Sequence, residues 1–246
     1  MTSQQTSLDR GLRLLALLQE RGELRLGRLI EELGSSRATV FRTLATLQAH
    51  GFVEHDRATR SYRLGPALRA GQTAAIAQQA TQALQELVER TGETAGLVVV
   101  QGRRLRYAMV QPGTYAVRFT AAVGAGVPAH ASPAGKAILA ALTPSQRDAF
   151  LGREPYAGLT ARTIVRRAPL EWELEASAER GYAVDDQESE MGTRGVAAAI
   201  LDGRRPLGAL SLSAPSTRLP QTDVARVGTL LVTLSRRIAE ALPPRP

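Results

Sequence analysis

Acidic side chains in the last third of the chain have the composition of a proton-transfer or metal site. Asp185, Asp186, Glu188 and Glu190 fall within six residues, and His130 could add a nitrogen ligand. Paired carboxylates can act as general acid and base, and carboxylate oxygens are ligands for hard cations. A solvated acidic loop is the commoner explanation of such a run, and we favour it from the sequence. A metal site and a hydrolytic site are the alternatives.

Other catalytic and nucleotide-binding motifs are absent from this sequence or lack required residues. The chain has no cysteine, which excludes disulfides, thiolate zinc sites and a cysteine nucleophile, and no serine lies in G-x-S-x-G. The run 124–129 fits a loose dinucleotide fingerprint, with Asp148 at the spacing of a ribose-binding acid, but Pro128 stands where the helix should grow. Gly135-Lys136 lacks the other residues of a phosphate-binding loop. We therefore interpret His130 as a pocket-wall or hydrogen-bonded core residue.

Basic residues are concentrated at the N-terminal end. The chain carries 31 basic and 23 acidic residues, net +8, and every basic residue except Lys136 is arginine. Residues 1–72 hold 11 arginines and 7 acids, net +4 in less than a third of the chain. Such an excess is compatible with a polyanionic partner.

Three short helices are expected in this basic region. The first begins with Ser7 as its cap and ends at Gly22, and the second covers residues 26–33. Ser35 or Ser36 caps the third, which runs to His50. The turn of about three residues between the second and third helices is the helix-turn-helix spacing.

The third helix separates an apolar face from a hydroxyl-rich, basic face. Val40, Leu44 and Leu47 share one side, and Thr39 and Arg42 lie opposite without an acid. Short hydroxyls and arginine can approach a DNA groove and bind phosphates or base edges, although a solvated helix face is the simpler alternative. Strands at 52–56 and 61–64 then frame a basic hairpin tip, which completes a winged helix-turn-helix. The candidate DNA contacts are Ser35, Ser36, Arg37, Thr39, Arg42, Thr43, Arg57 and Arg60.

The rest of the chain alternates blocks of strand and helix patterns. A helix over about 67–90 is either a connector or the first helix of the next domain. We expect strands at 97–100, 105–110, 115–120, 196–201 and 207–213, and helices at 132–142, from 143, at 169–180 and at 222–241. This order predicts an α+β domain with a largely antiparallel sheet. No apolar run reaches ~18 residues and no apolar signal region begins the chain, so we expect a cytoplasmic protein without a membrane contact.

Several spaced blocks resemble the IclR family of bacterial transcription regulators. They are SLDRGLRLL at 7–15, SSRATVFRTLATLQAHGFVEHD at 35–56, SYRLGPAL at 61–68, PAHASPAGKAILAAL at 128–142, GYAVDDQESEMGTRGVAAAI at 181–200 and LGALSLSAPSTRL at 207–219. The resemblance implies a winged helix-turn-helix over 1–66, a linker helix over 67–92, and an effector-binding domain of GAF-like or profilin-like fold over 93–246. It also implies a homodimer or homotetramer on double-stranded operator DNA, a small organic acid effector and no cofactor.

The resemblance also implies an effector pocket. Its residues would be Ser132, Pro133, Ala134, Gly135, Asp185, Gly195, Ser211 and Ser213. A capped helix N-terminus suits an anion, a glycine there would let a ligand come close, and two serines at i and i+2 project to one face of a strand. Many family members have cysteine where this sequence has Gly195, so we expect a larger pocket or a displaced ligand. The alternative function is a ligand-binding or metal-dependent enzymatic domain with a vestigial helix-turn-helix.

Overall fold

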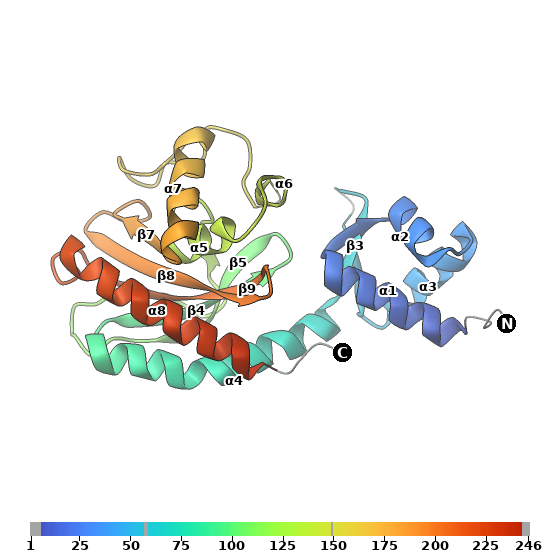
Figure 1. Ribbon diagram of the computed structural model, residues 1–246, viewed down its shortest axis with the longest axis horizontal. Coiled ribbons are helices and arrows are strands. Elements are labelled where there is room, and N and C mark those ends of the chain that lie inside the picture. Colours follow the sequence, from blue (N-terminus) through green and yellow to red (C-terminus); the bar gives the residue numbers. More distant parts are fainter. Residues whose placement is uncertain (1–5, 57–58, 149, 243–246) are drawn as a thin grey trace. The chain divides into compact units, whose positions relative to one another are not determined.

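The computed structural model describes residues 6–56, 59–148 and 150–242 of the chain. Its internal contacts divide it into two compact units, Met1–Ala74 and Ala75–Pro246. The division falls inside a long helix, α4 (Pro66–Thr91), which contributes residues to both units (Figure 1). The domain boundaries expected after residues 66 and 92 stay a prediction.

The N-terminal unit contains three helices and a small sheet. Its helices are α1 (Ser7–Arg21), α2 (Leu26–Leu33) and α3 (Arg37–Ala49), and its strands are β1 (Glu23–Arg25), β2 (Val53–Asp56) and β3 (Ser61–Leu64). The strands pair antiparallel in the order β1-β3-β2. The helix-turn-helix and the hairpin expected from the sequence are therefore present, and β1 is an addition that three residues were too few to signal.

Apolar side chains from all three helices and the hairpin form the core of this unit. The fully buried members are Leu14, Leu18, Leu29, Leu33, Val40, Leu44, Val53 and Tyr62. The expected cap of α1 was wrong by one residue: Thr6 is the N-cap, and its Oγ1 accepts the Asp9 N–H at 3.1 Å. The cap of α3 is Ser36, one of the two serines expected there.

The C-terminal unit is built on a six-stranded antiparallel sheet. Its order is β6-β5-β4-β9-β8-β7. The strands are β4 (Thr94–Gln101), β5 (Arg104–Gln111), β6 (Gly126–Val127), β7 (Ala183–Asp186), β8 (Thr193–Asp202) and β9 (Arg205–Pro215), and the helices beside α4 are α5 (Pro133–Ala140), α6 (Pro144–Arg147), α7 (Arg167–Arg180) and α8 (Gln221–Ala241). The predicted α+β class with an antiparallel sheet is confirmed.

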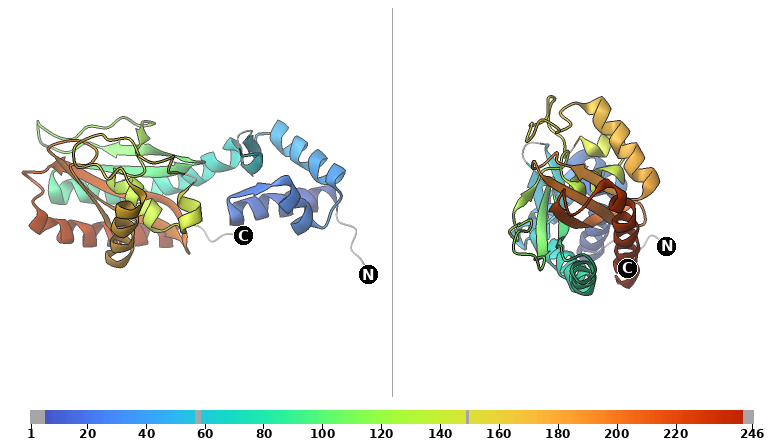
Figure 2. Two further views of the ribbon diagram at one scale, coloured as in Figure 1. Left: turned by 90° about the horizontal axis from the view of Figure 1, so that it is seen from above. Right: turned by 90° about the vertical axis from the view of Figure 1, so that its left-hand side faces the viewer.

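Helices cover both faces of this sheet (Figures 1 and 2). Leu97 and Val99 of β4 pack with α4 and α8, whereas Val98 between them packs with α5 on the other face. Alternate residues of a strand point to opposite faces, so the same rule places every second residue of β9 toward α5. The α5 face therefore receives Ala209, Ser211 and Ser213, which makes it the face on which the expected pocket residues can meet.

Two expectations about strands were incomplete or wrong. The segment 115–120 alternates in sequence but forms no strand, and the third strand of this region is the two-residue β6 instead. β7 was not expected, because its sequence Ala-Val-Asp-Asp carries only two apolar residues. Within the described ranges, no helix combines the length and the hydropathy needed to cross a bilayer.

Candidate functional sites

The helix α3 is fixed by its cap and its buried stripe. Ser36 Oγ accepts the Thr39 N–H at 3.3 Å and lies 2.9 Å from Thr39 Oγ1, which starts the helix. Val40 and Leu44 are buried in the core of the N-terminal unit. Since these residues anchor one side, the opposite side of α3 faces solvent.

The solvent side of α3 carries the residues expected to bind DNA. Ser36, Arg37 and Arg42 are exposed, and neither arginine forms an ion pair with a described residue. Ser35, Thr39 and Thr43 are half-buried at the edges of this side, and α3 contains no acidic residue. Unpaired guanidinium groups on an acid-free helix suit a polyanion such as DNA. Arg60 is exposed at the start of β3, whereas Arg57 lies outside the described residues.

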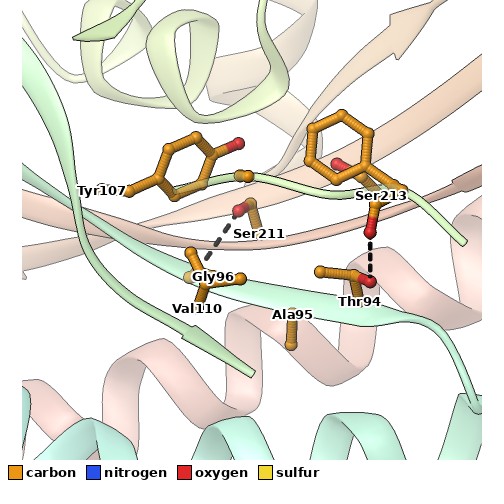
Figure 3. Close-up of a pocket in the computed structure, with 9 residues that line it drawn as sticks. Thr94, Ala95, Gly96, Tyr107, Val110, Ser211 and Ser213 are labelled. Atoms are coloured by element: carbon orange, nitrogen blue, oxygen red, sulfur yellow. Dashed lines mark hydrogen bonds between the residues drawn. The ribbon is translucent and has the colours of Figure 1, made fainter. Parts of the chain in front are cut away.

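A small pocket opens on the α5 face of the large sheet (Figure 3). Its side chains pack so closely that no room for a water molecule remains between them. The pocket is lined by Thr94, Ala95, Gly96, Tyr107, Val110, Phe119, Ala121, Ser211 and Ser213. The four hydroxyl-bearing side chains are its polar groups, and it has no charged side chain in its wall. Ser211 Oγ donates to the Gly96 carbonyl at 3.3 Å, and Thr94 Oγ1 donates to the Phe119 carbonyl at 2.7 Å.

Strand register explains why these polar residues meet. Ser213 pairs with Thr94 on one side and with Gly195 on the other, and Gly195 in turn pairs with Asp185. Residues directly opposite in adjacent strands project to the same face. A single row across β4, β9, β8 and β7 therefore joins the pocket to the buried acid Asp185.

The N-terminus of α5 packs tightly against this row. A Cβ on Gly195 would lie 2.7 Å from Pro133 Cγ and 3.2 Å from Ser213 Oγ. The expectation that the missing side chain enlarges the pocket was therefore wrong, because the Pro133 ring occupies that space. Gly135 also differs from expectation: its Cβ would meet the Ala129 carbonyl oxygen at 2.4 Å, so this glycine permits close packing with the chain's own backbone.

Ser132 caps α5 from a buried position. Its Oγ accepts the Gly135 N–H at 3.0 Å and donates to the Pro128 carbonyl at 2.7 Å. Neither Ser132 nor Pro133, Ala134, Gly135, Asp185 or Gly195 lines the pocket, whereas Ser211 and Ser213 do. Of the first group, Gly195 is paired directly with the lining residue Ser213.

Behind the pocket lies a buried group of charges. Lys136 is 0% exposed, and its Nζ donates to Glu188 Oε1 and lies 3.8 Å from Glu173 Oε1. Asp185, 1% exposed, accepts the Glu188 N–H at 2.6 Å and the Ser189 hydroxyl. Glu188 is 7% exposed, and its second oxygen has no hydrogen-bond partner within the part of the chain that the structure describes. The interpretation of this run as a solvated loop was wrong for Asp185 and Glu188.

Burial perturbs the titration of these groups. It raises the pKa of Asp185 above its ordinary value, while hydrogen bonds from Ser189 and Glu188 and the charge of Lys136 oppose the shift. Burial likewise raises the pKa of Glu188 against the stabilising charge of Lys136. Burial, with a smaller effect from the nearby Asp185, raises the pKa of Tyr107 to about 12, so this phenol is a neutral hydrogen-bond donor at pH 7.

The remaining members of the acidic run and His130 lie apart from this group. Asp186 pairs with Arg194 at 2.7 Å and Arg162 at 3.0 Å, and Glu190 is exposed. His130 Nε2 is 2.9 Å from the Ala157 carbonyl, and its ring is tilted against Tyr156. Over residues 6–56, 59–148 and 150–242, no cluster of three or more His, Asp or Glu residues could hold a metal ion.

Comparison with known proteins agrees with this architecture. The model described as "IclR helix-turn-helix domain" matches residues 7–57, and "Bacterial transcriptional regulator IclR C-terminal" matches residues 69–240. The chain belongs to the IclR family. The Escherichia coli "Transcriptional repressor IclR" is 31% identical over 249 residues, which cover 98% of this chain and 91% of the relative. "HTH-type transcriptional regulator XynR" of the same species is 32% identical, covering 96% of each.

Solved IclR structures share the fold. The IclR regulator of Alicyclobacillus acidocaldarius superposes with a TM-score of 0.63 at 27% identity and covers 96% of this chain and 98% of its own. The IclR family and these relatives are transcription regulators, so this chain is a DNA-binding regulator with a C-terminal effector domain and is not an enzyme. The enzymatic alternative is thereby set aside.

The sequence and its resemblance to the IclR family did not predict roles for three polar residues, two that line the pocket and one in the buried charge group. Tyr107 was expected only as a strand residue and Thr94 was placed in no expected strand, although both line the pocket together with the predicted serines. Lys136 was treated as an ordinary helix position. One signal could have found it: a chain that uses arginine 30 times keeps its single lysine here, where a compact ammonium fits a buried pair.

Proposed function

We propose that this regulator is a repressor that binds operator DNA as a homo-oligomer, and that a small organic acid in the C-terminal unit changes that binding. The observation that carries the DNA half is the acid-free solvent side of α3, with Arg37 and Arg42 both unpaired among the described residues. Relatives named "Transcriptional repressor IclR" and "Acetate operon repressor" support repression. We place the protein in the cytoplasm, where its DNA is.

The lining of the pocket supports a small polar effector. Because the lining side chains leave no room for a water molecule, they must move apart before even an acid of a few carbons can enter. Tyr107 and Ser213 offer hydroxyl donors to a carboxylate, and Asp185 lies in the same row across the sheet as Ser213. We assign effector binding to this wall and its supporting residues, Ser132, Pro133, Ala134, Gly135, Asp185, Gly195, Ser211 and Ser213.

In a dimer or tetramer, two copies of α3 can bind the same DNA duplex. Two α3 helices placed about one helical turn apart, roughly 34 Å, would read the two halves of a pseudo-palindrome. Ser35, Ser36, Arg37, Thr39, Arg42 and Thr43 would contact the groove, and Arg57 and Arg60 would bind backbone phosphates beside it.

The test is a fluorescence-anisotropy titration of the full chain against the intergenic DNA beside its own gene. It is run at two salt concentrations, with and without a panel of small carboxylates. We expect selective binding over a scrambled duplex, with log K falling against log[salt] at a slope of about −0.9 per phosphate contact. One acid in the panel should change the affinity.

Two variants separate the functions of the two units. Arg42→Ala should weaken DNA binding and leave carboxylate binding intact, whereas the Ser211→Ala/Ser213→Ala double variant should do the reverse. Absence of selective DNA binding in the wild type would contradict the proposal. Equal loss of both activities in Arg42→Ala would contradict the division of labour.

A further inference from the structure

Phe41 is a large apolar side chain left in solvent on α3. Its side chain is 56% exposed, although eight other apolar residues of the same unit are buried in its core. Exposed aromatics are costly to hydrate and are common at interaction surfaces. Phe41 was not among the DNA contacts expected from the sequence.

The neighbours of Phe41 form a narrow apolar strip on the helix surface. Ala38 and Ala45, three residues before and four after it, are both exposed. Side chains at these spacings lie next to one another. Arg42 and Arg37 flank this strip, and α3 contributes no acid. The surface therefore combines one aromatic ring, two methyl groups and two cations.

We propose that Phe41 reads thymine, by placing its ring against the C5-methyl group in the major groove. This inference rests on the proposed function of α3 as the DNA-reading helix. Thymine is the base that displays an apolar methyl group in that groove, and apolar side chains contact it there. Recognition helices contact base edges mainly through their N-terminal residues, and Phe41 is the fifth residue of α3.

Charge complementarity selects DNA over a second copy of this helix as the occupant. A self-paired α3 would bring Arg37 and Arg42 of two copies together without a carboxylate on either helix. Like charges facing one another at an interface are unfavourable. A duplex supplies phosphates for the arginines and methyl groups for the ring on the same surface.

The experiment removes the methyl groups without requiring the operator sequence. The intergenic fragment is amplified once with dTTP and once with dUTP, since uracil keeps the pairing and hydrogen-bonding edges of thymine and lacks only the methyl group. Wild-type protein should bind the uracil fragment more weakly, by about fourfold for each methyl group buried. Phe41→Ala should bind the thymine fragment more weakly than wild type does and should not discriminate between the fragments.

Arg42→Ala is the matched control on the same helix. It should weaken binding to both fragments and keep the wild-type ratio between them, because its contacts do not involve the methyl group. Circular dichroism should show Phe41→Ala folded, as expected for an exposed side chain, and Phe41→Leu should restore part of the discrimination.

Four results would overturn the proposal. One is equal wild-type affinity for both fragments, and another is a wild-type ratio that persists in Phe41→Ala. A third is a change in oligomeric state of Phe41→Ala in sedimentation, which would assign the ring to a protein contact. The fourth, wild-type protein without selective binding to the thymine fragment, would remove the proposed function itself and is distinct from the first three.

Discussion

Lys136 is a charged side chain buried in the C-terminal unit, so its loss should have a large electrostatic effect. It is fully buried and pairs with Glu188, whose backbone N–H in turn holds Asp185. A buried ion pair adds little net stability, but removal of one partner leaves an uncompensated charge. Lys136 therefore stabilises the charged form of Glu188 and, through it, the turn around Asp185.

Lys136→Met should destabilise the C-terminal unit by about 3–5 kcal/mol at pH 7. Circular dichroism during urea unfolding measures the loss, because the only tryptophan, Trp172, is already 71% exposed in the folded unit. Without Lys136 the pKa of Glu188 should rise further, since burial already raises it. An acid with a higher pKa in the folded state takes up protons on folding, so the deficit should shrink as the pH falls toward the ordinary value of 4.5.

The control is the double variant Lys136→Met/Glu188→Gln. It removes both charges and should be more stable at pH 7 than Lys136→Met alone. A deficit that is independent of pH, or a double variant no more stable than the single one, would contradict this account of the pair.

Gly195 leaves room for the ring of Pro133, and this steric role can be measured. Gly195→Cys, the residue common in the IclR family at this position, should place its Cβ against Pro133 Cγ and destabilise the unit by about 1–3 kcal/mol through overpacking. Gly126→Cys is matched to it, because a Cβ at Gly126 meets nothing within 4 Å. Urea unfolding under reducing conditions compares the two, and equal stability of both variants would show that Pro133 yields without cost.

At the scale of elements, residues 112–125 form an irregular segment between β5 and β6 that covers the pocket. Phe119 and Ala121 line the pocket from this segment. Arg218, which follows β9, anchors this segment. Its Nη2 donates to the Val117 carbonyl and to Glu93 Oε2, both at 2.9 Å. Its guanidinium carbon lies 4.4 Å from the centroid of the Tyr115 ring. These bonds replace the ladder that a strand would have formed.

Arg218→Gln should loosen this cover. We expect faster amide hydrogen exchange across 112–125 and weaker carboxylate binding, with DNA affinity unchanged, because the segment loses its cation-mediated anchors. Arg226→Gln is the control, since the one ion pair of Arg226 with a described residue is an exposed pair with Asp223 on α8. Unchanged exchange in 112–125 would show that the remaining hydrogen bonds of the segment, such as Thr94 to Phe119 and Thr114 to Gly92, suffice.

The elements predicted best from the sequence are those whose apolar spacing and end residues lie within the element itself. The stripe Val40-Leu44 and the cap at Ser36 define α3 because both signals are local. Residues 115–120 alternate like a strand, yet their carbonyls are taken by Thr94 and Arg218, which lie about 25 and 101 residues away in sequence. The same limit applies to the pocket: the resemblance to the IclR family implied Ser211 and Ser213, and strand periodicity placed both on one face, whereas the buried pair of Lys136 depends on Glu188, 52 residues further on.

At the scale of the whole molecule, α4 is the covalent path between the two units. Ile76, Ala80 and Leu87 of this helix belong to the core of the C-terminal unit, while its first turns belong to the N-terminal unit. A signal from the pocket can reach α3 only if an element has two states that both ligands bias. A continuous helix can serve in that role, because it contributes residues to both units.

Thermodynamic linkage then makes a two-sided prediction. If a carboxylate changes the DNA affinity by a given factor, typically ~5–150-fold, DNA must change the carboxylate affinity by the same factor. Isothermal titration calorimetry with and without the intergenic duplex measures the second factor, and anisotropy measures the first. Ala74→Gly/Ala75→Gly, at the division within α4, should weaken the helix by about 1 kcal/mol per substitution and reduce both factors together. Each ligand alone should still bind with nearly wild-type affinity. Ala225→Gly on the exposed side of α8 should leave the coupling unchanged. Full coupling in the α4 variant would mean that the signal passes between the units by another route.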